Sequence, residues 1–97
     1  MNNFTENDYK VLMSIINRND NQKGLCKLRG TTIKEIVANT KLSDKKVRHT
    51  IKLFKELGFI EEGYRKVRER TYILTKDGIK ELKSLGKNIF GEVINNG

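Results

Sequence analysis

The chain has 97 residues, which is enough for one small domain with a single hydrophobic core, and 36% of them are apolar. Its net charge of +8 and its pI of about 9.8 favour a polyanionic partner, and most of the positive excess lies in residues 41–87. One cysteine excludes an intramolecular disulfide, one Cys and one His exclude a Cys/His zinc cluster within the chain, and no apolar run is long enough to cross a membrane.

The first helix is predicted to begin after Thr5, whose hydroxyl can cap the free amides of the first turn. Apolar residues recur at three- and four-residue spacing from Tyr9 to Ile16, which predicts one buried face. The polar run "NRNDNQKG" ends this helix, and a loop leads on to "RGTT". Cys26 in that loop is expected to be a small, partly buried residue. A redox role would require neighbouring positive charge to stabilise its thiolate.

Two more helices follow, joined by a tight turn. Thr32 and Glu35 fit a capping box, in which each side chain satisfies the other's backbone amide, so a short helix should begin there and stop near Asn39. Ser43 is predicted to cap the third helix, and Gly58 stands where a left-handed residue would end it.

The third helix has two separate faces. On a helical wheel, Val47, Ile51 and Phe54 fall together on an apolar side. The opposite side is basic and carries Lys45, Arg48, His49, Lys52 and Lys55. Such faces are common on soluble proteins, but like charges placed side by side on a helix repel one another. Contact with a negatively charged partner would relieve that repulsion.

The stretch "FIEEGYRKVRERTYILT" predicts a β-hairpin, because β-prone segments at 59–64 and 70–75 flank a strongly basic centre. No Asn-Gly pair is present, so the loop is expected to exceed two residues. Tyr64 and Tyr72 are expected to pack within the hairpin. The positive charge of the centre favours a second contact with a polyanion.

A last helix is predicted at about residues 76–94, capped by Thr75. Its apolar stripe runs from Ile79 to Val93, and Ile15 of the first helix is left over once the core has been filled. These residues are the predicted surface of a homodimer.

The order of helix, helix, tight turn, helix, basic hairpin and helix resembles the winged helix-turn-helix DNA-binding proteins, the MarR-like group broadly. The matching segments are "TTIKEIVANTKLSDKKVRHTIKLFKELGFIEEG" and "RTYILTKDGIKEL". The resemblance implies one α+β, mainly helical domain over residues 1–97, with a three-helix core, a wing and a C-terminal helix.

The segment "YKVLMSIINRND" and the lack of an appended ligand domain are similar, more narrowly, to TubR-type centromere-binding proteins of plasmids and phages. Those proteins bind repeated DNA sites as dimers and couple them to a tubulin-like GTPase filament. This resemblance implies dimerisation through the third helices as an alternative to the last helix.

The predicted DNA contacts follow from placing the third helix in the major groove, whose base edges offer hydrogen-bond donors and acceptors. On that helix they are Ser43, Lys45, Lys46, Arg48, His49 and Lys52. On the wing, which can follow the backbone or enter a narrow minor groove, they are Arg65, Lys66, Arg68 and Arg70. At the start of the second helix, Thr31 and Thr32 are predicted to offer hydroxyls and amides to a phosphate.

Two other classes of function, an enzyme and a module that binds only proteins, fit the sequence less well. An enzyme would need convergent groups, yet the only Cys/His pair is Cys26 with the outward-facing His49, and neither a phosphate-binding glycine loop nor H-E-x-x-H is present. We therefore expect no catalytic residue, metal or cofactor. A module that binds only proteins usually has an apolar or acidic patch on the wing or third helix, where this chain is basic.

The leading hypothesis is a cytoplasmic, sequence-specific double-stranded DNA-binding protein that acts as a small dimeric transcriptional repressor. No leader segment opens the sequence, and no membrane partner is expected. The alternative is an adaptor for DNA partition that links repeated DNA sites to a tubulin-like GTPase filament. Both functions need the same DNA-facing chemistry, so the residues alone leave the choice open.

Overall fold

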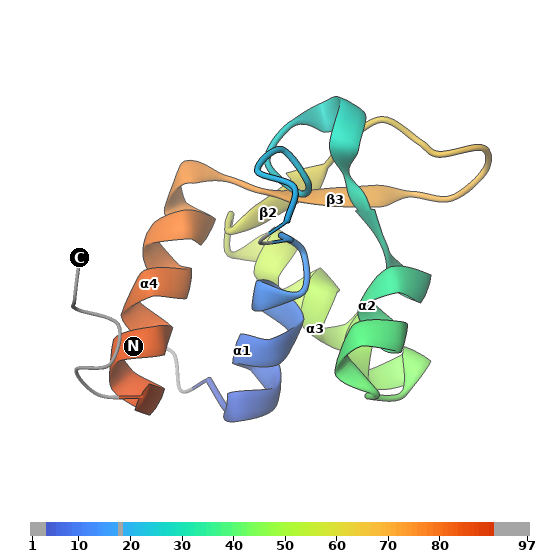
Figure 1. Ribbon diagram of the computed structural model, residues 1–97. Coiled ribbons are helices and arrows are strands. Elements are labelled where there is room, and N and C mark those ends of the chain that lie inside the picture. Colours follow the sequence, from blue (N-terminus) through green and yellow to red (C-terminus); the bar gives the residue numbers. More distant parts are fainter. Residues whose placement is uncertain (1–3, 18, 91–97) are drawn as a thin grey trace.

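The computed structural model describes the backbone of residues 4–17 and 19–90, with side chains described as far as residue 85. Three helices form the body, and a fourth lies beside the first, with a small sheet across one end of the bundle (Figure 1). In chain order the elements are α1 (Glu6–Met13), the 3-10 helix η1 (Lys27–Arg29), β1 (Thr31–Thr32), α2 (Ile33–Thr40), α3 (Asp44–Glu56), β2 (Ile60–Glu62), β3 (Thr71–Leu74) and α4 (Lys76–Phe90).

The predicted helix caps are confirmed. The Thr5 hydroxyl accepts a hydrogen bond from the Asp8 amide at 3.2 Å, and the Asp8 carboxylate accepts one from the Thr5 amide at 3.0 Å. Thr32 and Glu35 form the same reciprocal box at the start of α2. Ser43 caps α3 by accepting from the Lys46 amide at 3.1 Å. Each cap stabilises its helix start by about 1 kcal/mol.

The turn between α2 and α3 depends on one left-handed residue. Lys41 has φ of 64° and closes α2 through a hydrogen bond from its amide to the Val37 carbonyl. The Thr40 hydroxyl then accepts from the Leu42 amide at 3.2 Å, which directs the chain into α3. At the other end of α3, Gly58 has φ of 81°, as its position after the helix predicted.

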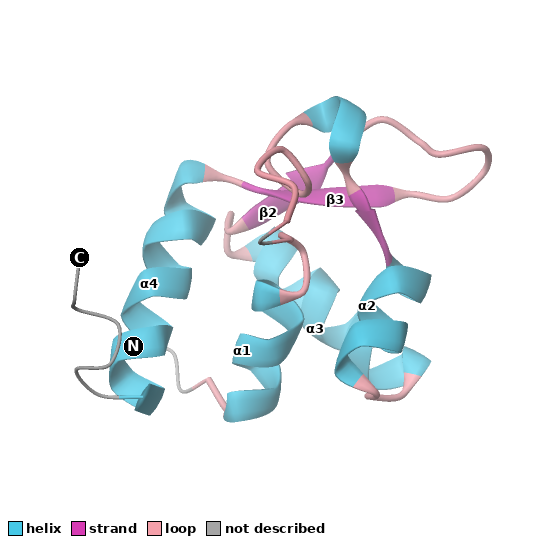
Figure 2. Cartoon of the chain, in the orientation of Figure 1, coloured by secondary structure: helices cyan, strands magenta, loops and turns pink. Residues whose placement is uncertain are grey.

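The sheet has three antiparallel strands in the order β1-β3-β2 (Figure 2). The predicted hairpin is confirmed as β2 and β3, with Ile60 opposite Leu74 and Glu62 opposite Tyr72. Strand β1 was not predicted, and it pairs Thr31 with Tyr72 on the far side of β3. Together, β2, β3 and the 63–70 connection between them form the wing, so the chain has a winged helix-turn-helix fold.

The core lies where α1, α2, α3 and α4 meet under the sheet. Its fully buried side chains include Leu12 of α1, Ile36 of α2 and Phe54 of α3. Two residues of the predicted dimer surface are used within one copy, because Ile15 is 0% exposed and Leu82 of α4 is only 9% exposed; the dimer surface itself stays a prediction. The α4 stripe is used to cover α1. The side chains of Ile89 and Val93 lie outside the described residues.

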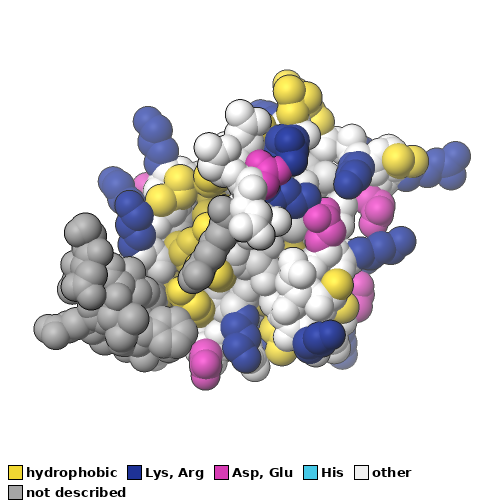
Figure 3. Space-filling view, viewed as in Figure 1, with side chains coloured by type: hydrophobic (Ala, Val, Ile, Leu, Met, Phe, Trp, Pro, Cys, Tyr) yellow, Lys and Arg dark blue, Asp and Glu magenta, His cyan; other side chains and the backbone are white. Residues whose placement is uncertain are grey.

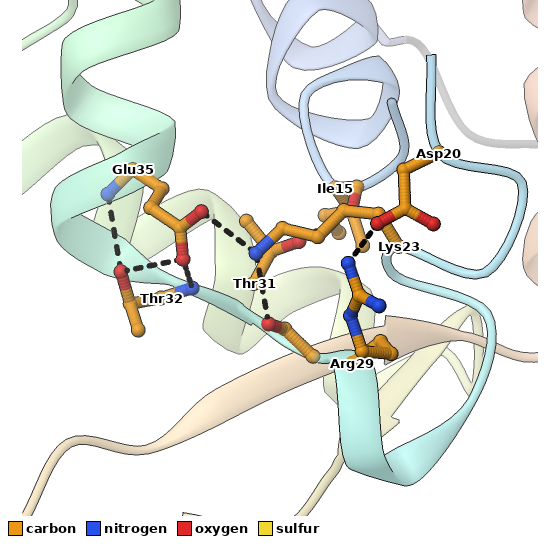
Figure 4. A network of polar contacts seen from close by, with 8 residues as sticks. Ile15, Asp20, Lys23, Arg29, Thr31, Thr32 and Glu35 are labelled. Atoms are coloured by element: carbon orange, nitrogen blue, oxygen red, sulfur yellow. Dashed lines mark hydrogen bonds and ion pairs between the residues drawn. The ribbon is translucent and has the colours of Figure 1, made fainter. Parts of the chain in front are cut away.

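The loop between α1 and η1 is fixed to the body by polar contacts (Figure 4). The Lys23 ammonium forms an ion pair with Glu35 at 2.7 Å and donates to the Gly30 carbonyl at 3.2 Å. The Thr31 hydroxyl donates to the Ile15 carbonyl at 2.5 Å. Partial burial acts to raise the pKa of Glu35, but hydrogen bonds from Lys23 and Thr32 outweigh it and lower the pKa below 4.5.

Gly24 in the same loop cannot be replaced by another residue without backbone strain and a steric clash. Its φ is 76°, and a Cβ atom there would lie 2.0 Å from the Ile15 carbonyl oxygen. Its own carbonyl accepts a hydrogen bond from the Leu74 amide at 2.8 Å, so the loop is joined to the C-terminal end of β3. None of the described helices is both long and apolar enough to serve as a membrane span.

Candidate nucleic-acid interface

The outer face of α3 presents its basic side chains to solvent, as the helical wheel predicted. Val47, Thr50, Ile51 and Phe54 occupy the buried face of this helix. Lys45, Arg48, His49, Lys52 and Lys55 are all exposed. The first turn of α3 is free to approach a large ligand, because the capping residue Ser43 is itself exposed.

Two of these cations already have an anionic partner. The Arg48 guanidinium donates to the Asp44 carboxylate at 2.5 Å, one turn earlier, and this hydrogen bond raises the pKa of Arg48. Lys55 donates to Glu62 of β2 at 2.6 Å, which lowers the pKa of Glu62. Within the described part of the chain, neither Lys45 nor Lys52 has an ion pair. These two lysines therefore carry uncompensated charge on α3.

A basic groove runs between α3 and the wing, and we call it the α3–wing groove. It consists of two adjoining hollows of about 220 and 300 Å³. The side chains that line both hollows are Ile33, Arg48, Arg70 and Tyr72. Ile51, Lys52 and Lys55 complete the first hollow, and Arg68 and Glu69 complete the second. Cations from two separate elements therefore converge on one concave surface, which is the geometry required to follow a curved polyanion.

The wing divides its cations between two sides. Arg68 and Arg70 line the α3–wing groove, whereas Arg65 and Lys66 line a different hollow of about 290 Å³. That reverse hollow is bounded by Leu28 of η1 and by the exposed Tyr64, among others. At the start of β3 the two sides also separate, since Tyr72 lines the groove and Thr71 lines the reverse hollow, as expected for successive residues of a strand.

Three predicted contact residues point elsewhere. Thr31 is 1% exposed and Thr32 is 4% exposed, and the hydroxyls of both are used by internal hydrogen bonds. Their side chains therefore do not meet a phosphate, and that prediction is wrong. Lys46 turns away from the basic face, and its ammonium lies 3.5 Å from the Asp8 carboxylate of α1. It fixes the start of α3 against the start of α1.

The predictions for the two tyrosines of the hairpin have different outcomes. Tyr72 packs in the hairpin as expected, at 8% exposure, whereas Tyr64 is 61% exposed and does not. Cys26 is partly buried, as expected for a loop residue. Among the described residues, no cluster of His, Cys, Asp or Glu could hold a metal ion.

Sequence reasoning missed three uncharged residues of the groove. These residues line it beside Arg48, although the sequence predicted packing within the hairpin for Tyr72 and the inward faces of their helices for the other two, Ile33 and Ile51. Lys34 of α2 was also overlooked, although its exposed ammonium lies 3.9 Å from Glu69 of the wing. The signal for Lys34 was its place on the outer side of α2, in the first turn after the Thr32 cap.

Proteins similar to this chain include DNA-binding proteins. No protein-family model matches the chain. The curated DNA-binding protein TubR of Clostridium botulinum C phage is 34% identical over 80 residues, which cover 82% of this chain and 94% of that protein. The solution structure of the DNA-binding TubR fragment from Clostridium botulinum superposes with a TM-score of 0.64 at 32% identity, over 86% of this chain and 98% of that one.

A third similar protein is described as a type III plasmid segregation TubR. Its structure superposes with a TM-score of 0.63 at 26% identity, over 86% of this chain and 75% of that one. The matched region in these structures is long enough to include the helix-turn-helix and the wing together.

Proposed function

Because the chain belongs to the TubR family of DNA-binding proteins, we propose that it binds double-stranded DNA through α3 and the α3–wing groove. The observation that carries this proposal is the convergence of Arg48 and Lys52 of α3 with Arg68 and Arg70 of the wing on one groove. A major groove is wide enough for an α-helix, and a neighbouring hairpin then lies against the backbone or the adjacent minor groove.

The residues divide between two kinds of contact. Lys45 and Arg48 stand at the leading end of α3, where side chains reach base edges, and Arg48 can donate two hydrogen bonds to the O6 and N7 atoms of guanine. Lys52 lies one turn farther along and is placed to contact phosphate. Arg68 and Arg70 approach the backbone from the wing. Such phosphate contacts fix the position of the protein, and the base contacts supply its sequence preference.

We infer that the biological role is DNA partition rather than repression. The support is that a similar structure is a type III plasmid segregation protein. In this proposal a homodimer binds repeated sites and acts as an adaptor to a tubulin-like GTPase filament. Since Ile15 and Leu82 are buried within one copy, neither is available for a dimer contact. The TubR-type resemblance implies the third helix as the alternative dimer surface, through residues other than the cations that we assign to DNA.

The test is selection of bound fragments from a genomic DNA library at about 150 mM salt, which suppresses loose polyanion binding. Recovery of a cluster of tandem repeats beside a gene for a tubulin-like GTPase supports the adaptor. Recovery of a single inverted repeat at a promoter supports the repressor instead. Enrichment of no sequence refutes both. Arg48→Ala serves as the control variant, and it should reduce specific binding by about 1–3 kcal/mol while the protein stays folded.

A further inference from the structure

The end of the wing is a strained two-residue turn. Lys66 and Glu69 pair as an antiparallel bridge, in which each amide donates to the other's carbonyl at 2.9 and 3.0 Å. Val67 and Arg68 are left as the loop. Val67 has φ of 59°, a left-handed conformation in which a β-branched residue is a true outlier. Glycine, asparagine or aspartate would occupy this position with less strain.

The strained residue is also the most exposed large apolar side chain that the structure describes. Val67 is 93% exposed, compared with 79% for Leu28 and 61% for Tyr64. Figure 3 shows a hydrophobic side chain among Lys and Arg side chains at the far end of the wing. Within the described residues Val67 has no place in the hydrophobic core. Neither packing nor turn chemistry accounts for valine here, and backbone strain of this kind concentrates at functional sites.

We propose that Val67 makes an apolar contact in the DNA minor groove next to the major groove that receives α3. This inference rests on the proposed function and adds a specific residue to it. Arg68 beside it contacts a phosphate at the edge of that groove, and this contact brings the valine to the groove. The walls of the minor groove are sugars and its floor is formed by base edges, and proteins that bind there frequently insert apolar side chains.

The short turn gives this contact its precision. A two-residue loop closed by the Lys66–Glu69 bridge holds the valine in one direction, so little conformational entropy is lost on binding. The backbone strain at Val67 is present in the free protein. The free energy gained when the valine side chain leaves water on binding compensates for it. The contact adds affinity without adding charge, which separates its effect from that of the neighbouring cations.

The test compares Val67→Gly and Val67→Asn on a duplex that contains one selected site. Both substitutions relieve the left-handed strain and remove the methyl groups, but asparagine keeps the turn ordered whereas glycine frees it. We expect both variants to resist denaturant at least as well as the wild type. We expect both to bind DNA about tenfold more weakly, as the loss of one buried valine implies. The dependence of affinity on salt should not change, and hydroxyl-radical protection of the sugars flanking the site should decrease.

Each other result refutes the inference in a distinct way. Equal or tighter binding by either variant would show that the valine does not contact DNA. A changed salt dependence would mean that the substitution had displaced the cations. A loss seen only on adjacent repeated sites would place the valine against a neighbouring copy of the protein. If the wild type selected no DNA, the proposed function would fail first, before the variants were made.

Discussion

The division of the wing into two sides predicts that two pairs of cations with equal charge have unequal effects on DNA binding. Arg68 and Arg70 line the α3–wing groove, and Arg65 and Lys66 line the reverse hollow. We expect the double substitution of Arg68 and Arg70 by alanine to remove two phosphate contacts. The matched double substitution of Arg65 and Lys66 removes the same charge from the opposite side and should remove none.

The size of the effect follows from counterion release. Each phosphate contact contributes about 0.9 to the slope of the logarithm of affinity against the logarithm of salt concentration, so losing two lowers the slope by about 1.8. Between about 50 and 200 mM salt, the wild type should therefore lose about twelvefold more affinity than the Arg68/Arg70 variant. The assay is a fluorescence-anisotropy titration of a labelled duplex at several salt concentrations. Slopes lowered equally in the two double variants would show that DNA contacts both sides of the wing, and slopes unchanged in both would remove the wing from the interface.

Four further outcomes are expected. Thr50→Val should stabilise the fold by about 1 kcal/mol in chemical denaturation, because the Thr50 hydroxyl is buried without a described partner. Leu82→Asp should unfold the protein, at a cost of about 3 kcal/mol or more, and a folded monomer in sedimentation would contradict this. Ionised Glu35 should stabilise the fold above pH 4.5, and this stabilisation should fade as pH falls below that value toward the lowered pKa, so the stability difference between wild type and Glu35→Gln should shrink in acid. Asp44→Asn should strengthen binding to random DNA more than to a selected site, because it frees Arg48; equal gains on both duplexes would argue against this.

Local patterns were enough to predict most of the fold. Thr5, Thr32 and Ser43 each act within the first turn of their own helix, and the structure confirms all three as caps. The wing was also predictable, since its strands are neighbours in the chain. Strand β1 was not, because two residues carry no periodicity and their partner Tyr72 lies far along the sequence. Only the folded chain brings the two together.

Three predicted contact residues, Thr31, Thr32 and Lys46, are engaged elsewhere for the same reason. In the sequence, Lys46 is one more cation of the third helix. In the fold, Asp8 of α1 lies beside it and pairs with it. Thr31 has the chemistry of a phosphate ligand, but the loop before it brings the Ile15 carbonyl within reach of its hydroxyl. The division of the wing cations depends on the path of the 63–70 connection, which places Arg68 and Arg70 on one side and Arg65 and Lys66 on the other. The charge pattern predicted which surface is basic, and tertiary contacts determined which side chains lie on it.

The ion pair between Arg48 and Asp44 has a consequence for selectivity. Because Arg48 already pairs with Asp44, it would have to give up that ion pair in order to contact DNA. A single phosphate offers Arg48 roughly what Asp44 already provides, and it brings a second negative charge close to that carboxylate. A guanine edge offers two acceptors without a net charge. If Arg48 reads DNA as proposed, Asp44 would therefore favour base contacts over phosphate contacts without touching a base itself.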